Sequence, residues 1–148
     1  DHFDFYGYKS KGSQMISSCY PGIDVSKNFE VRAKIVAKTV NEKDSFGVIF
    51  NYLDDYNYNV LVIDRKTAVL LRIEKNEIIG YRVTDLKATS RRNAEYNLKI
   101  KSTYQDLEFY NNDVQVLRVR HLPMQYSGFG IYINGLQTID VEEVEFIQ

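Results

Sequence analysis

Hydrophobic and polar residues alternate with a period of two along much of this chain. The clearest segment covers residues 29–38, where the charged side chains stand between five apolar ones: Phe29, Val31, Ala33, Ile35 and Ala37. Only Val36 breaks the polar side. A period of two predicts a strand with one face in a core and the other in water. Residues 95–101 show the same alternation.

Turn-forming residues separate these segments. Asn111-Asn112-Asp113 stands between apolar runs at 107–109 and 114–116, and Asn and Asp tolerate the left-handed backbone of a hairpin turn. Further strands are expected at 3–8, 14–20, 130–134 and 138–147, with Gly135 between the last two. No apolar period of three helical turns is present. The pattern therefore predicts an all-β fold, an antiparallel β-sandwich of about twelve strands.

Residues 45–83 are expected to form four neighbouring strands of one sheet. A turn at 53–56 would pair Val48 with Val60, a turn at 64–67 would pair Val60 with Leu71, and a three-residue loop at 75–77 would lead to the fourth strand. Directly opposite residues share a face. The predicted core face is therefore entirely apolar or aromatic: Phe46, Val48, Phe50, Tyr58, Val60, Val62, Val69, Leu71, Ile73, Ile79, Tyr81 and Val83.

The opposite face of this sheet is polar at one end and apolar at the other. Its polar end carries amide, guanidinium and carboxylate groups, which suit a shallow groove for a polar ligand: Asn51, Asn57, Asn59, Arg72, Glu74 and Arg82. An alternative is a surface network of Arg72, Glu74 and Arg82. In that alternative, a loop or a partner domain would cover the apolar end around Leu61 and Leu70.

The composition of the chain limits the kinds of partner that it is expected to bind. The 19 basic and 20 acidic residues nearly cancel and are interspersed, so no basic field predicts a nucleic-acid partner. No run of about 18 apolar residues predicts a membrane span. Cys19 is the only cysteine, which excludes an internal disulfide and supplies too few ligands for structural zinc. One domain over 1–148 is expected. The start at Asp1 fits either a removed signal peptide or a domain excised from a longer chain.

Several of these motifs resemble the concanavalin A-like lectin/glucanase (laminin-G-like) jelly-roll domains. The similar segments are a Gly-aromatic strand, an acidic turn, an Asn-Tyr strand and a final Asp-bearing strand: 46–50, Asp54 with Asp55, 57–63, and 139–144. The chain looks most similar to bacterial extracellular sugar-associated modules, including the 3-keto-disaccharide hydrolase-like group. The resemblance implies that the final strand lies beside the first. Two residues depart from the family pattern. Asn59 replaces the second aromatic residue, and Asn51 stands where many relatives carry Arg.

Few residues of the sequence indicate a catalytic function. Glycoside hydrolysis needs two carboxyl groups about 5–10 Å apart, and the polar face offers only Glu74, although Asp54 or Asp55 could reach in from the turn. Asp140-x-Glu142-x-x-Glu145 partly matches a glucanase motif, but its first position differs and we expect it on a terminal edge strand. His2 and His121 are expected in turns, and Asp54 and Asp55 are expected to be solvated rather than to bind calcium. No cofactor, metal or catalytic residue is predicted.

The sequence therefore favours an extracytoplasmic, non-catalytic module that binds a glycan. A glycoside hydrolase and a structural module that docks a neighbouring domain of a longer protein are the alternatives. Tyr52 and Tyr56 could stack on a sugar from the turn. The candidate ligand-binding residues are Asn51, Tyr52, Tyr56, Asn57, Asn59, Arg72, Glu74 and Arg82.

Overall fold

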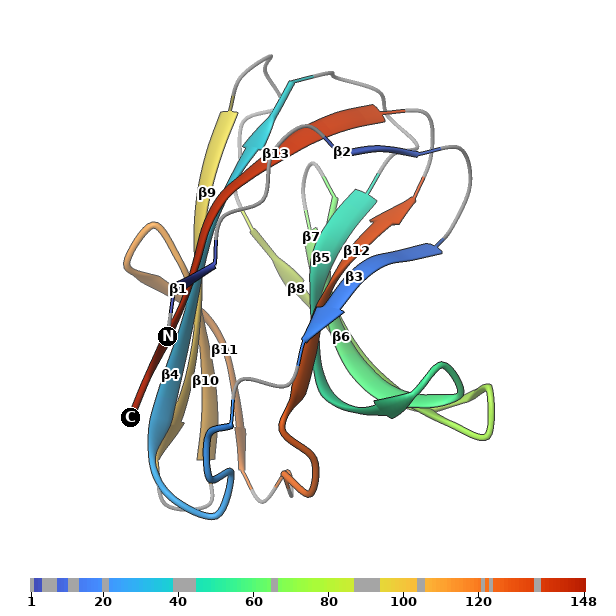
Figure 1. The fold of residues 1–148 in the computed structure, drawn as a ribbon, viewed down its shortest axis with the longest axis vertical. Helices are drawn as coiled ribbons and strands as arrows, with labels where there is room; N and C mark the ends of the chain where they lie inside the picture. Colours follow the sequence, from blue (N-terminus) through green and yellow to red (C-terminus); the bar gives the residue numbers. More distant parts are fainter. Residues whose placement is uncertain are drawn as a thin grey trace.

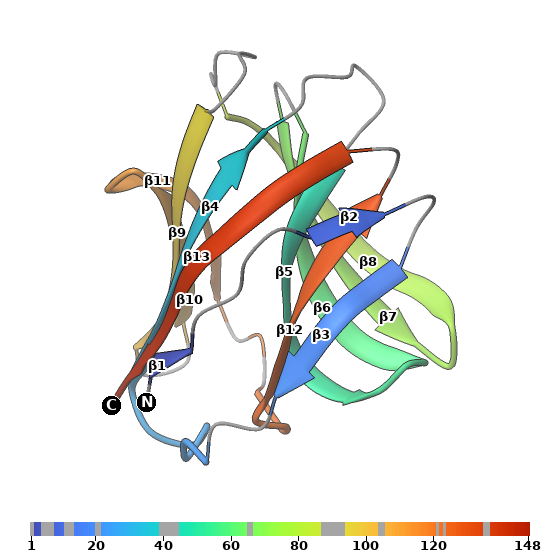
Figure 2. The same cartoon turned by 45° about the horizontal axis from the view of Figure 1, so that its top comes forward.

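The computed structural model describes residues 2–3, 8–10, 14–19, 22–38, 45–64, 67–86, 94–103, 106–120, 122, 124–134 and 137–148. These residues form thirteen strands in two antiparallel sheets and contain no helix. The sheets face each other as the two layers of a sandwich (Figures 1 and 2). The predicted all-β sandwich of about twelve strands is confirmed. His121, Gly135 and the centre of the 64–67 turn lie outside the described residues.

Both sheets combine strands that are far apart in the sequence. Sheet A has the spatial order β1 (His2–Phe3), β13 (Gln137–Ile147), β4 (Phe29–Ala37), β9 (Ala94–Thr103), β10 (Asp106–Asn111) and β11 (Val114–Arg120), and β2 (Tyr8–Ser10) also pairs with β13. Sheet B has the order β3 (Gln14–Cys19), β12 (Gly128–Asn134), β5 (Ser45–Asp54), β6 (Asn57–Ile63), β7 (Thr67–Glu74) and β8 (Glu77–Asp85).

Alternation in β4 and β9 places every second residue in the core, as predicted. The aromatic rings of this core join the two sheets. Phe50 of β5 lies 5.5 Å from Phe109 of β10 between ring centres, and Phe46 packs edge-on against Tyr96 at 5.0 Å. Offset and edge-on ring contacts of this kind stabilise the fold beyond the contribution of the buried apolar area. The sandwich is therefore held by contacts between residues distant in sequence.

Two short hairpin turns have residues with positive φ angles at their centres. Asn112 and Asp113 have φ angles of 51° and 65°, so the predicted hairpin turn is confirmed. Lys75 and Asn76 also have positive φ angles, 50° and 63°, and the flanking Glu74 and Glu77 pair directly. This turn has two residues, and the expected three-residue loop at 75–77 is wrong.

The predicted register of the central sheet is half right. The pairs between β6 and β7 are as expected, with Val60 opposite Leu71. Between β5 and β6 the register is displaced by one residue, because Val48 pairs with Leu61 and not with Val60. A one-residue displacement exchanges the faces of a strand. The predicted core face is therefore correct for β5 and wrong for β6, β7 and β8.

The apolar residues on the core side of β6 and β7 are those that had been assigned to the opposite face. They are Leu61, Ile63, Ala68 and Leu70, each at most 3% exposed. Leu61 and Leu70 therefore belong to the core between the sheets and cannot form the docking patch considered above. On the outer side, Val60 and Ile49 are buried in a second apolar cluster with Tyr52.

The final strand β13 lies beside β1, as the resemblance implied, but it is not an edge strand. It pairs with β4 on one side and with β1 and β2 on the other. Its acidic residues face basic residues of β4 and its end, with Glu142 3.2 Å from Lys34 and Asp140 3.2 Å from Lys38. The expectation of an edge strand was therefore wrong. Glu142 and Asp140 form two neighbouring ion pairs at the surface.

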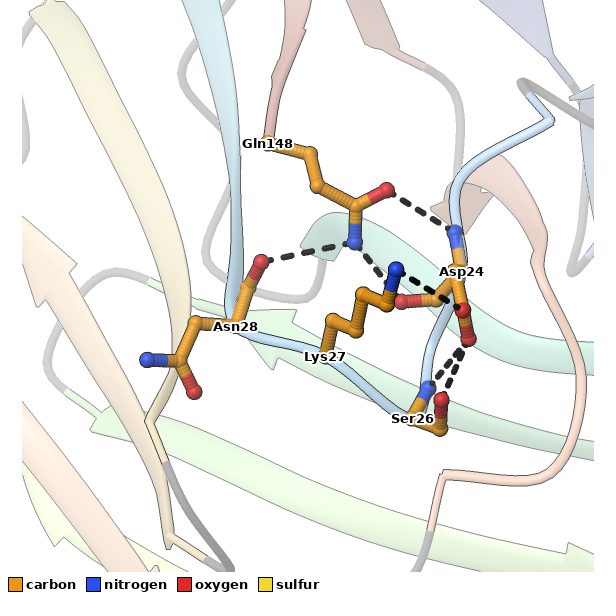
Figure 3. Close-up of polar contacts among 5 residues, drawn as sticks. All are labelled: Asp24, Ser26, Lys27, Asn28 and Gln148. Carbon is orange, nitrogen blue, oxygen red and sulfur yellow. Dashed lines mark hydrogen bonds and ion pairs between the residues drawn. The ribbon is translucent and has the colours of Figure 1, made fainter.

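A polar clasp joins the end of β13 to the segment that leads into β4 (Figure 3). The Gln148 side chain accepts a hydrogen bond from the Asp24 backbone nitrogen and donates one to the Asp24 backbone oxygen, at 3.0 and 2.7 Å. The Ser26 hydroxyl and backbone N–H both donate to the Asp24 carboxylate, and these bonds, the hydroxyl first, lower its pKa. The clasp therefore holds the end of β13 against the segment before β4, and its polar groups form hydrogen bonds with one another.

Within the described ranges, no helix has the length and apolarity needed to cross a membrane.

Candidate functional site

The candidate site begins at an irregularity in β5. Phe50 pairs with Asn59 and Asp54 pairs with Asn57, so the three residues 51–53 lie opposite the single residue Tyr58. Asn51 has a φ angle of 51°, in the left-handed region that Asn tolerates better than most residues. Extra residues in one strand bend it and increase its twist. The bulge therefore redirects the end of the β5–β6 hairpin.

Asn51 also holds the segment that precedes β12. Its side-chain oxygen accepts hydrogen bonds from the backbone nitrogens of Gln125 and Tyr126, both at 2.9 Å. One amide thus joins the bulge to a segment more than seventy residues later in the chain. Because both contacts are to backbone nitrogens, these two bonds require Asn51 but no particular side chain at 125 or 126.

Between this segment and the ends of β6 and β7 lies a hollow of about 250 Å³. Polar, aromatic and aliphatic groups line it from the bulge, from both strands and from the segment before β12: Asn51, Leu53, Asn57, Tyr58, Asn59, Arg72, Ile73, Glu74, Gln125 and Tyr126. The structure therefore brings five of the eight candidate residues together around one cavity.

Asn59 and Arg72 lie at the inner end of this hollow and are directly paired across β6 and β7. They share a face, as predicted, but it is the face turned toward the other sheet. Asn59 is only 4% exposed, and it is the only polar residue among the described ones with so little exposure. Its Nδ2 and the Nε of Arg72 are buried and have no hydrogen-bond partner among the described residues. Since buried polar atoms are normally paired, both side chains require an explanation.

Asn57 contributes to the shape of the site through the adjoining turns. Its side-chain nitrogen donates to the Asp54 carboxylate at 2.9 Å, and its side-chain oxygen accepts from the Lys75 backbone nitrogen at 3.0 Å. The Tyr56 backbone N–H also donates to Asp54, and this bond, followed by that of Asn57, lowers the pKa of the Asp54 carboxyl. Asn57 therefore ties the β5–β6 turn to the β7–β8 turn.

Three candidate residues lie outside the lining. Tyr52 belongs to the outer apolar cluster and donates its hydroxyl proton to the Asp55 carboxylate at 2.6 Å. Tyr56 is 60% exposed at the tip of the turn. Arg82 donates to the backbone oxygen of Arg118 at 3.2 Å and so joins the outermost strands of the two sheets.

The foreseen network of Arg72, Glu74 and Arg82 does not form. Arg72 takes part in no ion pair within the described ranges, and Glu74, although it lines the hollow, is likewise unpaired there. The strand pattern missed Gln125 and Tyr126, because a segment outside the strands has no alternation that would place it. Tyr58 and Ile73 were missed because the predicted register assigned them to the core face, and Leu53 was missed because it was expected in the turn at 53–56.

Carboxyl groups are scarce at the hollow. Among the residues that the structure describes, Glu74 is the one acidic residue in its lining. The Asp54 and Asp55 carboxylates, which could have reached in from the turn, instead accept hydrogen bonds from neighbouring residues of the same hairpin. No three His, Cys, Asp or Glu side chains of the described residues gather in a way that could hold a metal ion. The chemistry available in the hollow is therefore hydrogen bonding, one cation and one anion.

A scan of protein-family models and a search of curated protein sequences each gave no match. Solved structures do match. A carbohydrate-binding module, CBM66 from Bacillus subtilis, has a TM-score of 0.70 and 18% identity over 96% of this chain and 86% of that chain. The Caenorhabditis elegans galectin LEC-6 has a TM-score of 0.66 and 10% identity over 99% of this chain and 96% of the galectin.

A third structural match is part of an enzyme. The Aspergillus kawachii β-fructofuranosidase has a TM-score of 0.69 and 12% identity over 100% of this chain, but the match covers only 27% of that protein. At these identities the similarity shows the fold alone. The fold is a concanavalin A-like jelly-roll sandwich, as the resemblance predicted, and it is a fold that sugar-binding modules use.

Proposed function

We propose that this chain is a non-catalytic carbohydrate-binding module and that its ligand occupies the hollow beside Asn59 and Arg72. The observation that carries the proposal is the state of the Asn59 amide, which is 4% exposed, lines the hollow and has an unpartnered Nδ2. A side chain that served only the core would be apolar or paired. An unpaired amide at a cavity is better explained as a recognition group.

The size and composition of the hollow support a small polar ligand. About 250 Å³ is below the range of roughly 300–1,000 Å³ typical of drug-sized ligands, and it suits a single sugar unit. Amide, guanidinium and carboxylate groups can pair with hydroxyls, while Tyr126 and Leu53 offer apolar surface for the C–H groups of a sugar. The structural similarity to a carbohydrate-binding module and to galectins supports the same ligand class.

The scarcity of carboxyl groups supports binding over hydrolysis. A glycoside hydrolase ordinarily uses two carboxyl groups on opposite sides of the scissile bond, and the described part of the lining supplies Glu74 alone. The similarity to only a quarter or so of the fructofuranosidase also fits an accessory domain. We place the module outside the cytoplasm, as a secreted or surface domain of a bacterial protein, on its resemblance to extracellular sugar-associated modules.

A glycan array followed by calorimetry tests the proposal. We expect the wild-type domain to bind at least one class of saccharide, and we expect Arg72→Ala to abolish that binding. Arg82→Ala is the matched control, because it removes a guanidinium from the same sheet but outside the hollow. Its binding should equal that of wild type. Equal loss in both variants, with both folded, would contradict the assignment of the hollow.

Catalysis is tested separately with chromogenic glycosides. We expect no turnover by the wild-type domain. Turnover that disappears in Glu74→Gln would replace the binding module with the hydrolase alternative, because Glu74 is the acid nearest to any ligand in the hollow.

A further inference from the structure

The two unpartnered atoms at the hollow have the same hydrogen-bonding character. Asn59 Nδ2 and Arg72 Nε are both donors, and the residues that carry them are direct cross-strand neighbours, whose Cβ atoms lie about 4.5–5.5 Å apart. A buried donor without a partner costs about 1–3 kcal/mol of folding free energy. The group that would satisfy this pair is therefore an acceptor, and its oxygens would need to reach two adjacent donors.

The charge at this position points to an anion. The Arg72 side chain carries a positive charge on a planar guanidinium with several N–H donors. It forms no ion pair among the described residues. Glu74 lines the same hollow but is exposed, so water screens its charge more than it screens the partly buried guanidinium. Of these two charges in the lining, the guanidinium is therefore the one that water screens less.

We infer that the hollow binds a saccharide unit that carries a carboxylate, that is, a uronic acid. The inference rests on the proposed sugar-binding function and specifies the class of sugar. The planar guanidinium matches the two oxygens of a carboxylate, and such charge-assisted bonds are roughly twice as strong as neutral ones. The Asn59 amide, directly across the strand pair, supplies a further donor. Both donor atoms are covered in this structure, so a ligand would reach them only after the two side chains turn toward it.

Titration with matched sugars tests the inference. Glucuronate, galacturonate and mannuronate are each compared with their methyl esters and with the neutral parent hexoses, by calorimetry and by chemical-shift perturbation. We expect one uronate to bind at least tenfold more tightly than its own ester. We also expect this preference to shrink as the salt concentration rises, because it depends on an ion pair.

Three variants locate the preference. Arg72→Gln should remove it, so that the uronate and its ester bind alike. Arg82→Gln should preserve it. Glu74→Gln should strengthen uronate binding several-fold without a comparable gain for the ester, since it removes a like charge from the rim. A backbone chemical-shift fingerprint of each variant separates loss of binding from loss of fold.

The failures of the two proposals differ. If neutral sugars bind as tightly as uronates, the acidic-sugar inference is overturned and the carbohydrate-binding function stands. If a sulfated hexose binds more tightly than any uronate, the assignment to a carboxylate is overturned. If no sugar of either kind binds to a folded domain, the proposed function falls together with the inference.

Discussion

The inner face of the β6–β7 pair is apolar at one end and polar at the other. Leu61 and Leu70 pair directly and are 1% and 3% exposed, within the core. Two residues further along the same strands, Asn59 and Arg72 pair on the same face and line the hollow. The backbone pairing is continuous between the two ends. Only the residue types and what lies opposite them differ.

What lies opposite each end explains the difference. Figure 1 shows the turns at the free ends of β5–β6 and β7–β8 extending away from sheet A. At the apolar end the opposing layer is the aromatic core of sheet A. At the polar end the opposing group is the segment that Asn51 holds before β12. A single ladder thus makes a core where another sheet covers it and a candidate site where a loop covers it.

The largest expected effect is at the apolar end. Leu61→Ala should lower the free energy of unfolding by about 2–5 kcal/mol, because it leaves a cavity in a close-packed core. Leu53→Ala is the control at the other end, where the side chain is 43% exposed, and should cost less than about 1 kcal/mol. Urea denaturation measures both. Similar costs at the two positions would erase the distinction between core and hollow.

Gly47→Ala should also be strongly destabilising, by about 1–3 kcal/mol or more. A Cβ at Gly47 would lie 1.9 Å from the backbone oxygen of Leu61, so β5 and β6 could not keep their separation. Gly80→Ala is the matched control, since its Cβ would meet nothing closer than the Arg72 Cδ at 3.9 Å. We expect that variant to be as stable as wild type in thermal denaturation.

Asn51→Ala should cost about 1–3 kcal/mol, because it removes two hydrogen bonds and leaves Ala in a left-handed conformation. It should also weaken ligand binding, since the segment lining the hollow loses its anchor. Asn51→Asp keeps an acceptor oxygen and tolerates the same φ angle. If Asp fails to restore stability and binding in urea titration and calorimetry, the two bonds to the segment before β12 are not what positions it.

We expect Asp54 to make the stability of the protein modestly dependent on pH. Hydrogen bonds from the Tyr56 N–H and the Asn57 amide lower its pKa in the folded state below the ordinary value of 3.8. Its contribution to stability is therefore present above that value and is lost as the pH falls through the lower folded pKa. Asp54→Asn should flatten the acid limb of the stability profile. An unchanged acid limb in urea titrations between pH 2 and 5 would contradict this role.

The smallest change in stability is expected for Asn59→Leu. Leu has nearly the shape of Asn, and it removes a buried donor that has no partner, so the free energy of unfolding should stay within about 0.5 kcal/mol or rise. Ligand binding should be lost. A destabilisation above about 2 kcal/mol would mean that the Asn59 amide serves the fold and not recognition.

Much of the fold could be predicted because local signals were strong. Alternation placed β4 and β9, and Asn112 with Asp113 placed the β10–β11 turn. The β6–β7 register was also predicted correctly. Five of the eight candidate residues line the hollow. Asn57, Asn59, Arg72 and Glu74 do so because residues on one face of neighbouring strands stay neighbours even when that face is assigned to the wrong side, whereas Asn51 lies there because of the bulge in β5.

The error lay in the side of the sheet that faces the core. Val60 and Leu71 are as apolar as Leu61 and Leu70, so alternation in β6 and β7 favours neither face. The decision rested on the turn between β5 and β6, where residues 51–53 bulge opposite Tyr58 and displace the register. Bulges leave weak signals in sequence, because the residue that enables this one, Asn51, is common in ordinary turns as well.

The sequence by itself determined the strands, several of the hairpins that join neighbouring strands, and a cluster of amide and guanidinium groups at one end of a hairpin, because period and turn chemistry act over short distances. The tertiary structure decided which face is inside and which end of that face is open, because both depend on what a distant strand or segment covers. Residues 125 and 126, far along the chain, are held by Asn51 and line the hollow together with Asn59 and Arg72.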